Sequence, residues 1–370
     1  MRFAANGSMV TNTTQIMAFM WGAGGGSNIG DRPALPYPQA GSGAYIQAML
    51  NVSIGTQIGV IVATGGGHGI NITDTAIISP VVYGGLPGGG NSGGGSETGA
   101  AGLGVGSGGG GFSALLIDST FRVVAAGGGG LGINNQHYQF GPGTPGVIVM
   151  ANAGGGGCYS GGNATASVPG CNITATGGTQ TKGGSVQFTS QFHCSLSGNQ
   201  VFLAQDGSAW RGSDGGISTT NGVHGVSGGA GGGGLFGGCG GVAQTQAING
   251  VFLPSGAGAG GSSGCVPGTV GCSQITCEAA TIGSAGGALS SQYYVAGVGL
   301  GGDGSKVMDG ADGYVVISMC TVGSTDGNGC QCGKSPFPPL PASSGIRVLA
   351  NSFVIVILAM VAIVGFKMSH

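Results

Sequence analysis

The sequence predicts a mainly β protein with packed helices of the polyglycine-II type, followed by one C-terminal transmembrane helix. Glycine supplies 90 of the 370 residues, and four-glycine runs recur, each between a small residue and an apolar residue or a cysteine. With these flanking residues the runs occupy residues 107–112, 126–131, 153–158 and 230–235. Near the C-terminus, residues 348–366 form an apolar stretch in which only Asn351 and Ser352 are polar.

Short apolar stretches bounded by glycine or by polar turns predict the strands. The clearest are residues 15–21, 45–52, 57–63, 114–117, 120–126 and 313–319, and weaker signals lie within residues 182–202 and 250–252. Gly55-Thr56 and Asp118-Ser119 each separate two such stretches, so we expect two hairpins. No stretch before residue 348 has the sustained apolar period of a helix, which makes β-structure the expected class.

The glycine-rich segments are expected to be ordered. Disorder is typical of low hydrophobicity with high net charge, whereas 41% of these residues are hydrophobic and the net charge is −2. Ordering glycine costs roughly 0.5–1 kcal/mol per residue relative to alanine, so backbone hydrogen bonds must offset that cost. Consecutive glycines can form extended helices of three residues per turn in which every N–H is free to bond a neighbouring chain. The sequence therefore predicts glycine helices that pack side by side.

The apolar stretch at residues 348–366 is long enough to cross a membrane. As a helix it spans roughly 28 Å at 1.5 Å per residue, close to the ~30 Å hydrocarbon core. We therefore expect, at the plasma membrane, a glycine-rich ectodomain at residues 1–319, a cysteine-containing Pro/Ser/Gly stalk at 320–347, the membrane helix at 348–366 and a cytoplasmic tail at 367–370. Ser343, Ser344 and Gly345 leave a glycosylphosphatidylinositol (GPI) anchor as the alternative. The first residues contain no signal peptide, and we expect an N-terminal segment carrying one to be missing from this sequence.

Cysteines and glycosylation sequons favour an extracellular location. All ten cysteines precede residue 348, which suits an oxidising compartment. Each is a disulfide candidate: Cys158, Cys171, Cys194, Cys239, Cys265, Cys272, Cys277, Cys320, Cys330 and Cys332. Because Cys265, Cys272 and Cys277 lie on one loop, we expect local disulfides there. Sequons predict a glycoprotein with candidate sites at Asn6, Asn12, Asn51, Asn71, Asn163 and Asn172.

Five segments carry a resemblance to a known family. In chain order they are "QIMAFMWGAGGG", "AYIQAMLNVSIGTQIGVIVATGGG", "GSGGGGFSALLIDSTFRVVAAGGGG", "GGAGGGGLFGGCGG" and "VMDGADGYVVISM". In this order they resemble the glycine-rich ectodomain of the anaplastic lymphoma kinase and leukocyte tyrosine kinase receptors, over roughly residues 11–319. The resemblance implies a TNF-like β-sandwich combined with the polyglycine helices, a location outside the cell, and binding of a small protein ligand. Kinase motifs do not occur in the chain.

The residues that could carry chemistry are scattered, so we expect neither an enzyme nor a cofactor. A net charge of −2 gives no basic face for nucleic acid. Asp309 and Asp312, in the Met-Asp-Gly-x-Asp-Gly ending, are the candidate ligand contacts. Together with Asp303 they also fit an acidic ligand or calcium patch, although Asp-Gly turns before a strand are the simpler explanation.

Two classes of function are left. The first is a receptor-like ectodomain that lacks an intrinsic signalling domain, is anchored to the membrane and binds an extracellular protein ligand or a co-receptor. The second is a structural or adhesive glycine-rich coat protein that associates with itself.

The extracellular topology can be tested on gels. Because the sequons and cysteines precede residue 348, the full chain expressed in a eukaryotic secretory pathway with an added signal sequence should gain mobility after glycosidase treatment. Unchanged mobility, together with cysteines that label freely without reduction, would contradict this topology.

Overall fold

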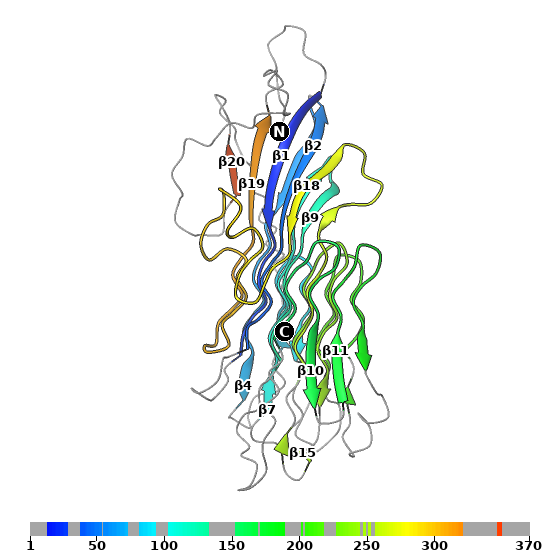
Figure 1. Ribbon diagram of the computed structural model, residues 1–370, viewed down its shortest axis with the longest axis vertical. Helices are drawn as coiled ribbons and strands as arrows, with labels where there is room; N and C mark the ends of the chain where they lie inside the picture. Colours follow the sequence, from blue (N-terminus) through cyan, green and yellow to red (C-terminus); the bar gives the residue numbers. More distant parts are fainter. Residues whose placement is uncertain are drawn as a thin grey trace, which may run out of the picture.

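The computed structural model describes residues 13–28, 38–53, 55–72, 81–93, 103–132, 152–168, 171–188, 201–202, 204–217, 227–244, 247–248, 251–252, 256–320 and 346–349. All named secondary-structure elements in these ranges are β-strands, so the predicted mainly β class is confirmed. The molecule is elongated: a β-sandwich lies at one end, glycine-rich segments run along the long axis, and short strands lie at the opposite end (Figure 1).

The first sheet of the sandwich has five strands in the order β18-β2-β1-β19-β20. They are β18 (Cys272–Glu278), β2 (Tyr45–Ser53), β1 (Thr13–Trp21), β19 (Tyr314–Cys320) and β20 (Ile346–Leu349). Neighbours run antiparallel except β19 and β20, which run parallel. Since alternate residues of a strand face opposite sides of a sheet, Ile16 and Met20 of β1 enter the core while Phe19 and Trp21 pack on the outer face.

The second sheet has the order β17-β9-β8-β3 and packs against the first. Its strands are β17 (Gly264–Cys265), β9 (Thr120–Ala125), β8 (Ser113–Ile117) and β3 (Ile58–Ile61), all antiparallel. Side chains from both sheets form one buried core, whose largest members are Ile16, Met20, Ile46, Leu50, Leu115, Val123 and Val315. Removing this apolar surface from water is the main force that holds the two sheets together.

One of the two expected hairpins forms and the other does not. β8 and β9 pair across Asp118 and Ser119, whose φ angles of 48° and 62° are those that a two-residue type I′ turn requires. The hairpin expected at Gly55-Thr56 is wrong, because β2 pairs with β1 and β18 while β3 pairs with β8. Both edges of β2 are occupied, so the chain crosses at this turn from one sheet to the other.

The remaining strands are short. They are β4 (Ile70–Ile72), β5 (Val81–Val82), β6 (Ser92–Gly93), β7 (Leu103–Val105), β10 (Ala164–Val168), β11 (Cys171–Ala175), β12 (Val186–Phe188), β13 (Val201–Phe202), β14 (Ala243–Gln244), β15 (Ala247–Ile248) and β16 (Val251–Phe252). Of these, β4, β7, β10, β11 and β15 lie at the end opposite the sandwich (Figure 1).

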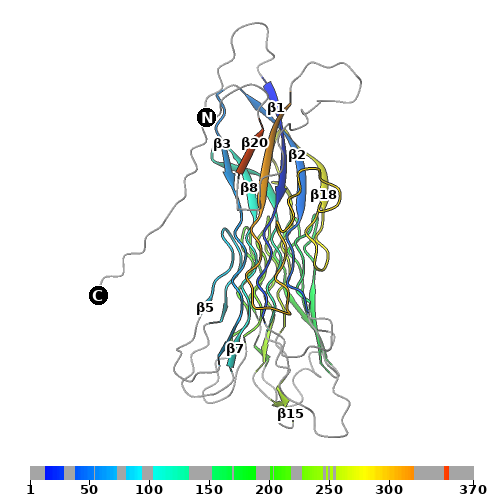
Figure 2. The ribbon, with the colours of Figure 1, turned by 90° about the vertical axis from the view of Figure 1, so that its left-hand side faces the viewer.

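Strands of the sandwich continue directly into glycine-rich segments (Figure 2). β1 is followed by residues 22–27, β8 is preceded by residues 107–112, and β9 is followed by residues 126–131. The sandwich and the glycine-rich part are therefore built from the same continuous segments.

Hydrogen bonds in residues 126–131 repeat every three residues. The N–H groups of residues 127 and 130 both donate to one neighbouring segment, at the carbonyls of residues 233 and 230. Those of residues 128 and 131 donate to a second neighbour, at the carbonyls of residues 23 and 26, and that of residue 129 donates to a third, at the carbonyl of residue 154. The carbonyls of residues 126 and 129 accept from residues 44 and 41, those of 127 and 130 from 261 and 258, and those of 128 and 131 from 110 and 107. This segment is thus bonded to six neighbours, with the period of an extended helix of three residues per turn.

Residues 107–112 show the same period. The N–H groups of residues 107 and 110 donate to the carbonyls of residues 131 and 128. Those of residues 108 and 111 donate to the carbonyls of residues 67 and 64, and those of residues 109 and 112 donate to the carbonyls of residues 90 and 87. We call the laterally bonded segments the glycine lattice; they include residues 22–27, 40–44, 64–69, 84–90, 107–112, 126–131, 153–157, 228–241 and 256–261.

At many glycine positions of the lattice there is no room for a side chain. A Cβ built on Gly129 would lie well inside contact distance of the Gly258 carbonyl oxygen, and one on Gly25 would collide in the same way with the Gly129 carbonyl. Apolar side chains instead close the ends of the glycine runs: Phe112, Leu131 and Leu235 are each 2% exposed. The four-glycine pattern therefore marks backbone-to-backbone packing.

The C-terminal prediction lies mostly outside the described residues. Val348 and Leu349, the first two residues of the predicted membrane helix, lie in β20, whereas residues 350–366 and the tail at 367–370 are not described. Within the described part of the chain, no helix has the length and apolarity needed to cross a membrane.

Gly129→Ala should abolish folding of the full chain, since its Cβ would meet backbone atoms of residues 258 and 259 that cannot turn away. Gly283→Ala is the matched control: Gly283 has φ of 71° and no atom within 4 Å of a Cβ. The control should lose only about 1–2 kcal/mol of unfolding free energy, measured by denaturant unfolding. Wild-type stability of the Gly129 variant would disprove the close packing.

Candidate binding site

Asp309 and Asp312, the predicted ligand contacts, bond to the backbone of residues 64–69. Oδ1 of Asp312 accepts a hydrogen bond from the Gly65 N–H at 2.9 Å, and Oδ1 of Asp309 accepts one from the His68 N–H at 2.8 Å. The two carboxylates are three residues apart, and so are the two N–H groups. The Met-Asp-Gly-x-Asp-Gly spacing therefore matches the hydrogen-bond period of the lattice.

The two carboxylates take the place of a neighbouring glycine segment. Residues 64 and 67 donate to the carbonyls of residues 86 and 83, and residues 66 and 69 donate to those of residues 24 and 27. The N–H groups of Gly65 and His68 point in a third direction, where the carboxylates of Asp312 and Asp309 accept their hydrogen bonds. Their role in ligand contact stays a prediction, and their structural role is to satisfy backbone donors of the lattice.

The acidic segment is extended at Asp309 and Asp312. Gly310 donates to the Gly66 carbonyl, so the Asp-Gly turn explanation is wrong at these two positions. At Asp303 the turn is present: the Ser305 N–H donates to Oδ1 at 2.9 Å, and this hydrogen bond lowers the pKa of the Asp303 carboxyl. In the described ranges, no three or more His, Cys, Asp or Glu side chains are arranged to hold a metal ion.

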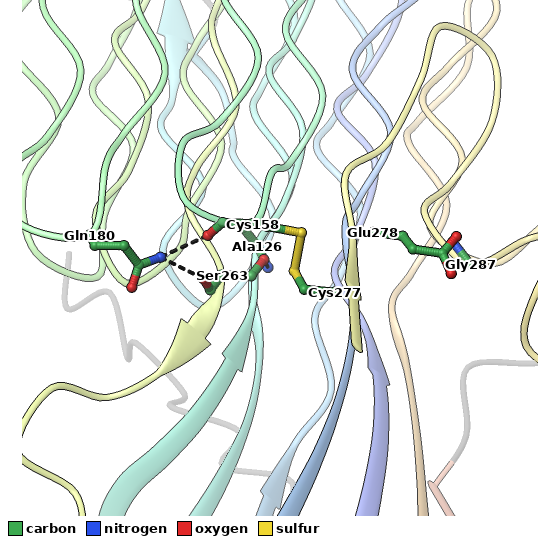
Figure 3. The surroundings of a disulfide bond; sticks show 7 residues. All are labelled: Ala126, Cys158, Gln180, Ser263, Cys277, Glu278 and Gly287. Carbon is green, nitrogen blue, oxygen red and sulfur yellow. Dashed lines mark hydrogen bonds between the residues drawn. A yellow bond between two sulfur atoms is a disulfide. The ribbon is translucent and has the colours of Figure 1, made fainter. Parts of the chain in front are cut away.

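In the described part of the chain, one disulfide lies within the sandwich and a second joins the sandwich to the lattice. Cys265–Cys272 closes a short loop, as the sequence predicts. Cys277 does not pair locally: it bonds Cys158, which is 119 residues away and ends a glycine run. Beside this bond, the Gln180 amide donates to the carbonyls of Cys158 and Ser263 at 2.7 and 2.6 Å (Figure 3). The end of the 153–157 segment is thus fixed to β18 of the first sheet.

Cys239 corrects another prediction. Its thiol is buried and free, its Sγ donates to the Gln205 carbonyl at 3.4 Å, and burial raises its pKa to about 12. Its disulfide assignment is therefore wrong, because the lattice surrounds the side chain and its hydrogen bond is with a carbonyl. The side chains of Cys171, Cys194, Cys320, Cys330 and Cys332 lie outside the description.

The sequons lie on different parts of the molecule. Asn51, on β2, and Asn163 are exposed; their amide oxygens accept from Gln15 Nε2 at 3.1 Å and from the Gly177 N–H at 2.9 Å. Asn71 is on β4 and Asn172 on β11, while Asn6 and Asn12 fall outside the described residues. Glycosylation at all six stays a prediction.

A cavity of about 460 Å³ opens on the outer face of the first sheet. Alternate residues of β1, β2 and β18 line it, and the segment 290–293 completes the wall. Residues Gln47 and Thr276 lie directly opposite each other in the sheet, as do Tyr45 and Glu278. The lining residues are Met17, Phe19, Tyr45, Gln47, Thr276, Glu278, Ser290, Ser291, Gln292 and Tyr293.

Aromatic packing holds the walls of this cavity. The rings of Phe19 and Tyr293 lie 4.4 Å apart between centroids, and those of Trp21 and Tyr45 lie 4.8 Å apart. The Trp21 indole N–H donates to the Gly286 carbonyl at 3.0 Å. This hydrogen bond ties the chain just before the segment 290–293 to β1. Burial is the main cause that raises the pKa of Tyr45 to about 12, and the nearby negative charge of Glu278 adds to it.

Among the described lining residues of the cavity, Glu278 is the acidic one. Its Oε2 accepts from the Gly287 N–H at 3.2 Å, and its Oε1 accepts from the Ser290 hydroxyl. No motif in the sequence indicates this site. Its residues come from three strands and a later segment, and only the pairing register brings them together.

Comparison with protein-family models gives no match, and none of the curated proteins is similar in sequence. The receptor resemblance therefore stays a prediction.

Asp312→Ala should destabilise the full chain by about 1–3 kcal/mol, because it leaves the Gly65 N–H without its acceptor. Asp312→Asn keeps an oxygen at that position and should lose less. Asp206→Ala, at an exposed position, is the control. Equal denaturation midpoints for the Asp312→Ala variant and the wild type would show that the carboxylate does not support the lattice.

Proposed function

We propose that this chain is a non-enzymatic binding module of the cell surface, in which the glycine lattice holds a β-sandwich that binds an extracellular protein ligand or co-receptor. The observation that carries the proposal is the six-sided bonding of residues 126–131. A segment bonded on all sides is already ordered before a partner arrives. Binding to such a platform loses less conformational entropy than binding to a flexible chain.

The scarcity of charged groups supports binding over catalysis. Asp, Glu, Lys and Arg make up 5% of the sequence. Catalytic sites gather titratable groups with perturbed pKa values. Asp309 and Asp312 each accept a hydrogen bond from a backbone N–H group, which favours a structural role for them over a catalytic one.

The finer parts of the proposal rest on the sequence. They are a TNF-like form of the sandwich, helices of the polyglycine-II type in the lattice, N-linked glycans, and single-pass anchoring by residues 348–366 with a GPI anchor as the alternative. The three-residue hydrogen-bond period supports the second of these.

A structural or adhesive coat protein is the second candidate. Large apolar side chains are exposed beside the sandwich: Val270 is 93% exposed and Leu289 is fully exposed. Self-association would cover them, because exposed apolar surface favours contact with another protein.

Cross-linking distinguishes the two candidates. The full chain, displayed on cells with an added signal sequence, is treated with a cross-linker in extracellular fluid, beside the Asp309→Asn/Asp312→Asn variant and a Val270→Asp/Leu289→Asp variant. A receptor-like module should give one discrete adduct with another protein. Equal capture by the Asn variant would assign the contact to the sandwich. Absence of an adduct, with assembly into sheets or fibres that the Val270/Leu289 variant prevents, would favour the coat protein.

A further inference from the structure

We propose that the cavity on the outer face of the first sheet receives a lysine or arginine side chain of the protein partner. The proposal rests on the binding function proposed above and names the chemistry of one contact. It is drawn from the charge, the aromatic walls and the size of the cavity.

The charge of the cavity comes from one residue. Among the described residues that line it, Glu278 is the only charged one, and none is a lysine or an arginine. Its carboxylate is held in place by the Gly287 N–H and the Ser290 hydroxyl. A carboxylate offers about four acceptor positions, so two hydrogen bonds leave it able to accept from a cation. Hydrogen bonds between oppositely charged groups are the stronger ones.

Aromatic residues line the same cavity as this carboxylate. Phe19, Tyr45 and Tyr293 all line the cavity, and the contact between Phe19 and Tyr293 fixes two of the rings. Aromatic faces attract ammonium and guanidinium groups through the ring quadrupole. A carboxylate that shares a cavity with three aromatic residues therefore favours a cation over an anion, which Glu278 repels, and over a neutral polyol, which leaves its charge uncompensated.

The size of the cavity, and exposed apolar residues next to its lining in sequence, suit one inserted side chain. At about 460 Å³ it lies in the lower part of the range typical of ligand sites, roughly 300–1,000 Å³. Ile275 and Leu289, which adjoin the lining residues Thr276 and Ser290 in sequence, are exposed. An anchor residue in a pocket, surrounded by contacts that exclude water, is the usual arrangement at protein interfaces.

The test uses the full chain with ¹³C-labelled methionine methyl groups. Met17 lines the cavity, whereas Met20 on the same strand is buried in the sandwich core, so their signals separate binding in the cavity from a general change. N-acetylarginine amide is titrated into the protein beside N-acetylcitrulline amide, which has a similar shape and no charge.

We expect the arginine probe to shift Met17 and leave Met20 in place, and the citrulline probe to bind about tenfold more weakly. Glu278→Gln should weaken arginine binding about tenfold, and Tyr293→Leu should weaken it severalfold by removing one ring. Asp206→Asn, which changes an exposed carboxylate away from the cavity lining, should not change it. An unmoved Met20 signal shows that each variant is folded.

Equal binding of the two probes, or unchanged arginine binding by Glu278→Gln, overturns the inference. A Met17 shift with methyl glycosides and none with the arginine probe also overturns it and assigns the cavity to carbohydrate. In the cross-linking experiment, a partner kept equally by Glu278→Gln overturns the inference and leaves the proposed function standing. Absence of any partner for the wild-type chain overturns the proposed function instead.

Discussion

Close approach of backbones with no side chain between them is the constraint on which the rest of this structure depends. A segment such as residues 126–131 points its N–H groups at three neighbours and its C=O groups at three others. Each neighbouring backbone must come within hydrogen-bond distance to pair with these groups. A Cβ at Gly25 or Gly129 would occupy the place of the neighbouring carbonyl. Glycine is therefore required at such positions, and its entropic cost is offset by lateral hydrogen bonds.

The same constraint shapes the sandwich. The strands reach their positions already attached to the lattice, so the lattice spaces the strands while the apolar core holds the sheets together. Ser113, at the start of β8, donates to the Trp21 carbonyl at 2.6 Å and accepts from the Ala63 N–H at 3.1 Å, just where the strands meet the lattice. The Cys158–Cys277 bond adds a covalent connection at the same level. The outer-face cavity thus lies on the sheet that this disulfide ties to the lattice.

Polar side chains stand in for absent segments around the lattice. Asn91 accepts from the Gly84 N–H at 2.9 Å, Asn163 accepts from the Gly177 N–H at 2.9 Å, and Ser213 accepts from the Gly240 N–H at 2.6 Å. Asp312 does the same for Gly65. At these four positions the polar residue next to glycine is a partner for backbone donors. For this reason an acidic motif beside glycines is weak evidence of a ligand contact.

The sequence by itself determined the local features: the strands at β1, β8, β9 and β19, the hairpin across Asp118-Ser119, and the glycine runs closed by Phe112, Leu131 and Leu235. These depend on turn chemistry, on apolar runs and on the absence of a Cβ, all of which neighbouring residues encode. Only the tertiary structure decided that β3 leaves β2 for the second sheet, that Cys277 bonds Cys158, and that Tyr45 and Glu278 share a cavity. Each of these joins residues far apart in the chain, and their meeting is fixed by which sheet edges and lattice positions are free, a property of the packed whole that no local pattern carries.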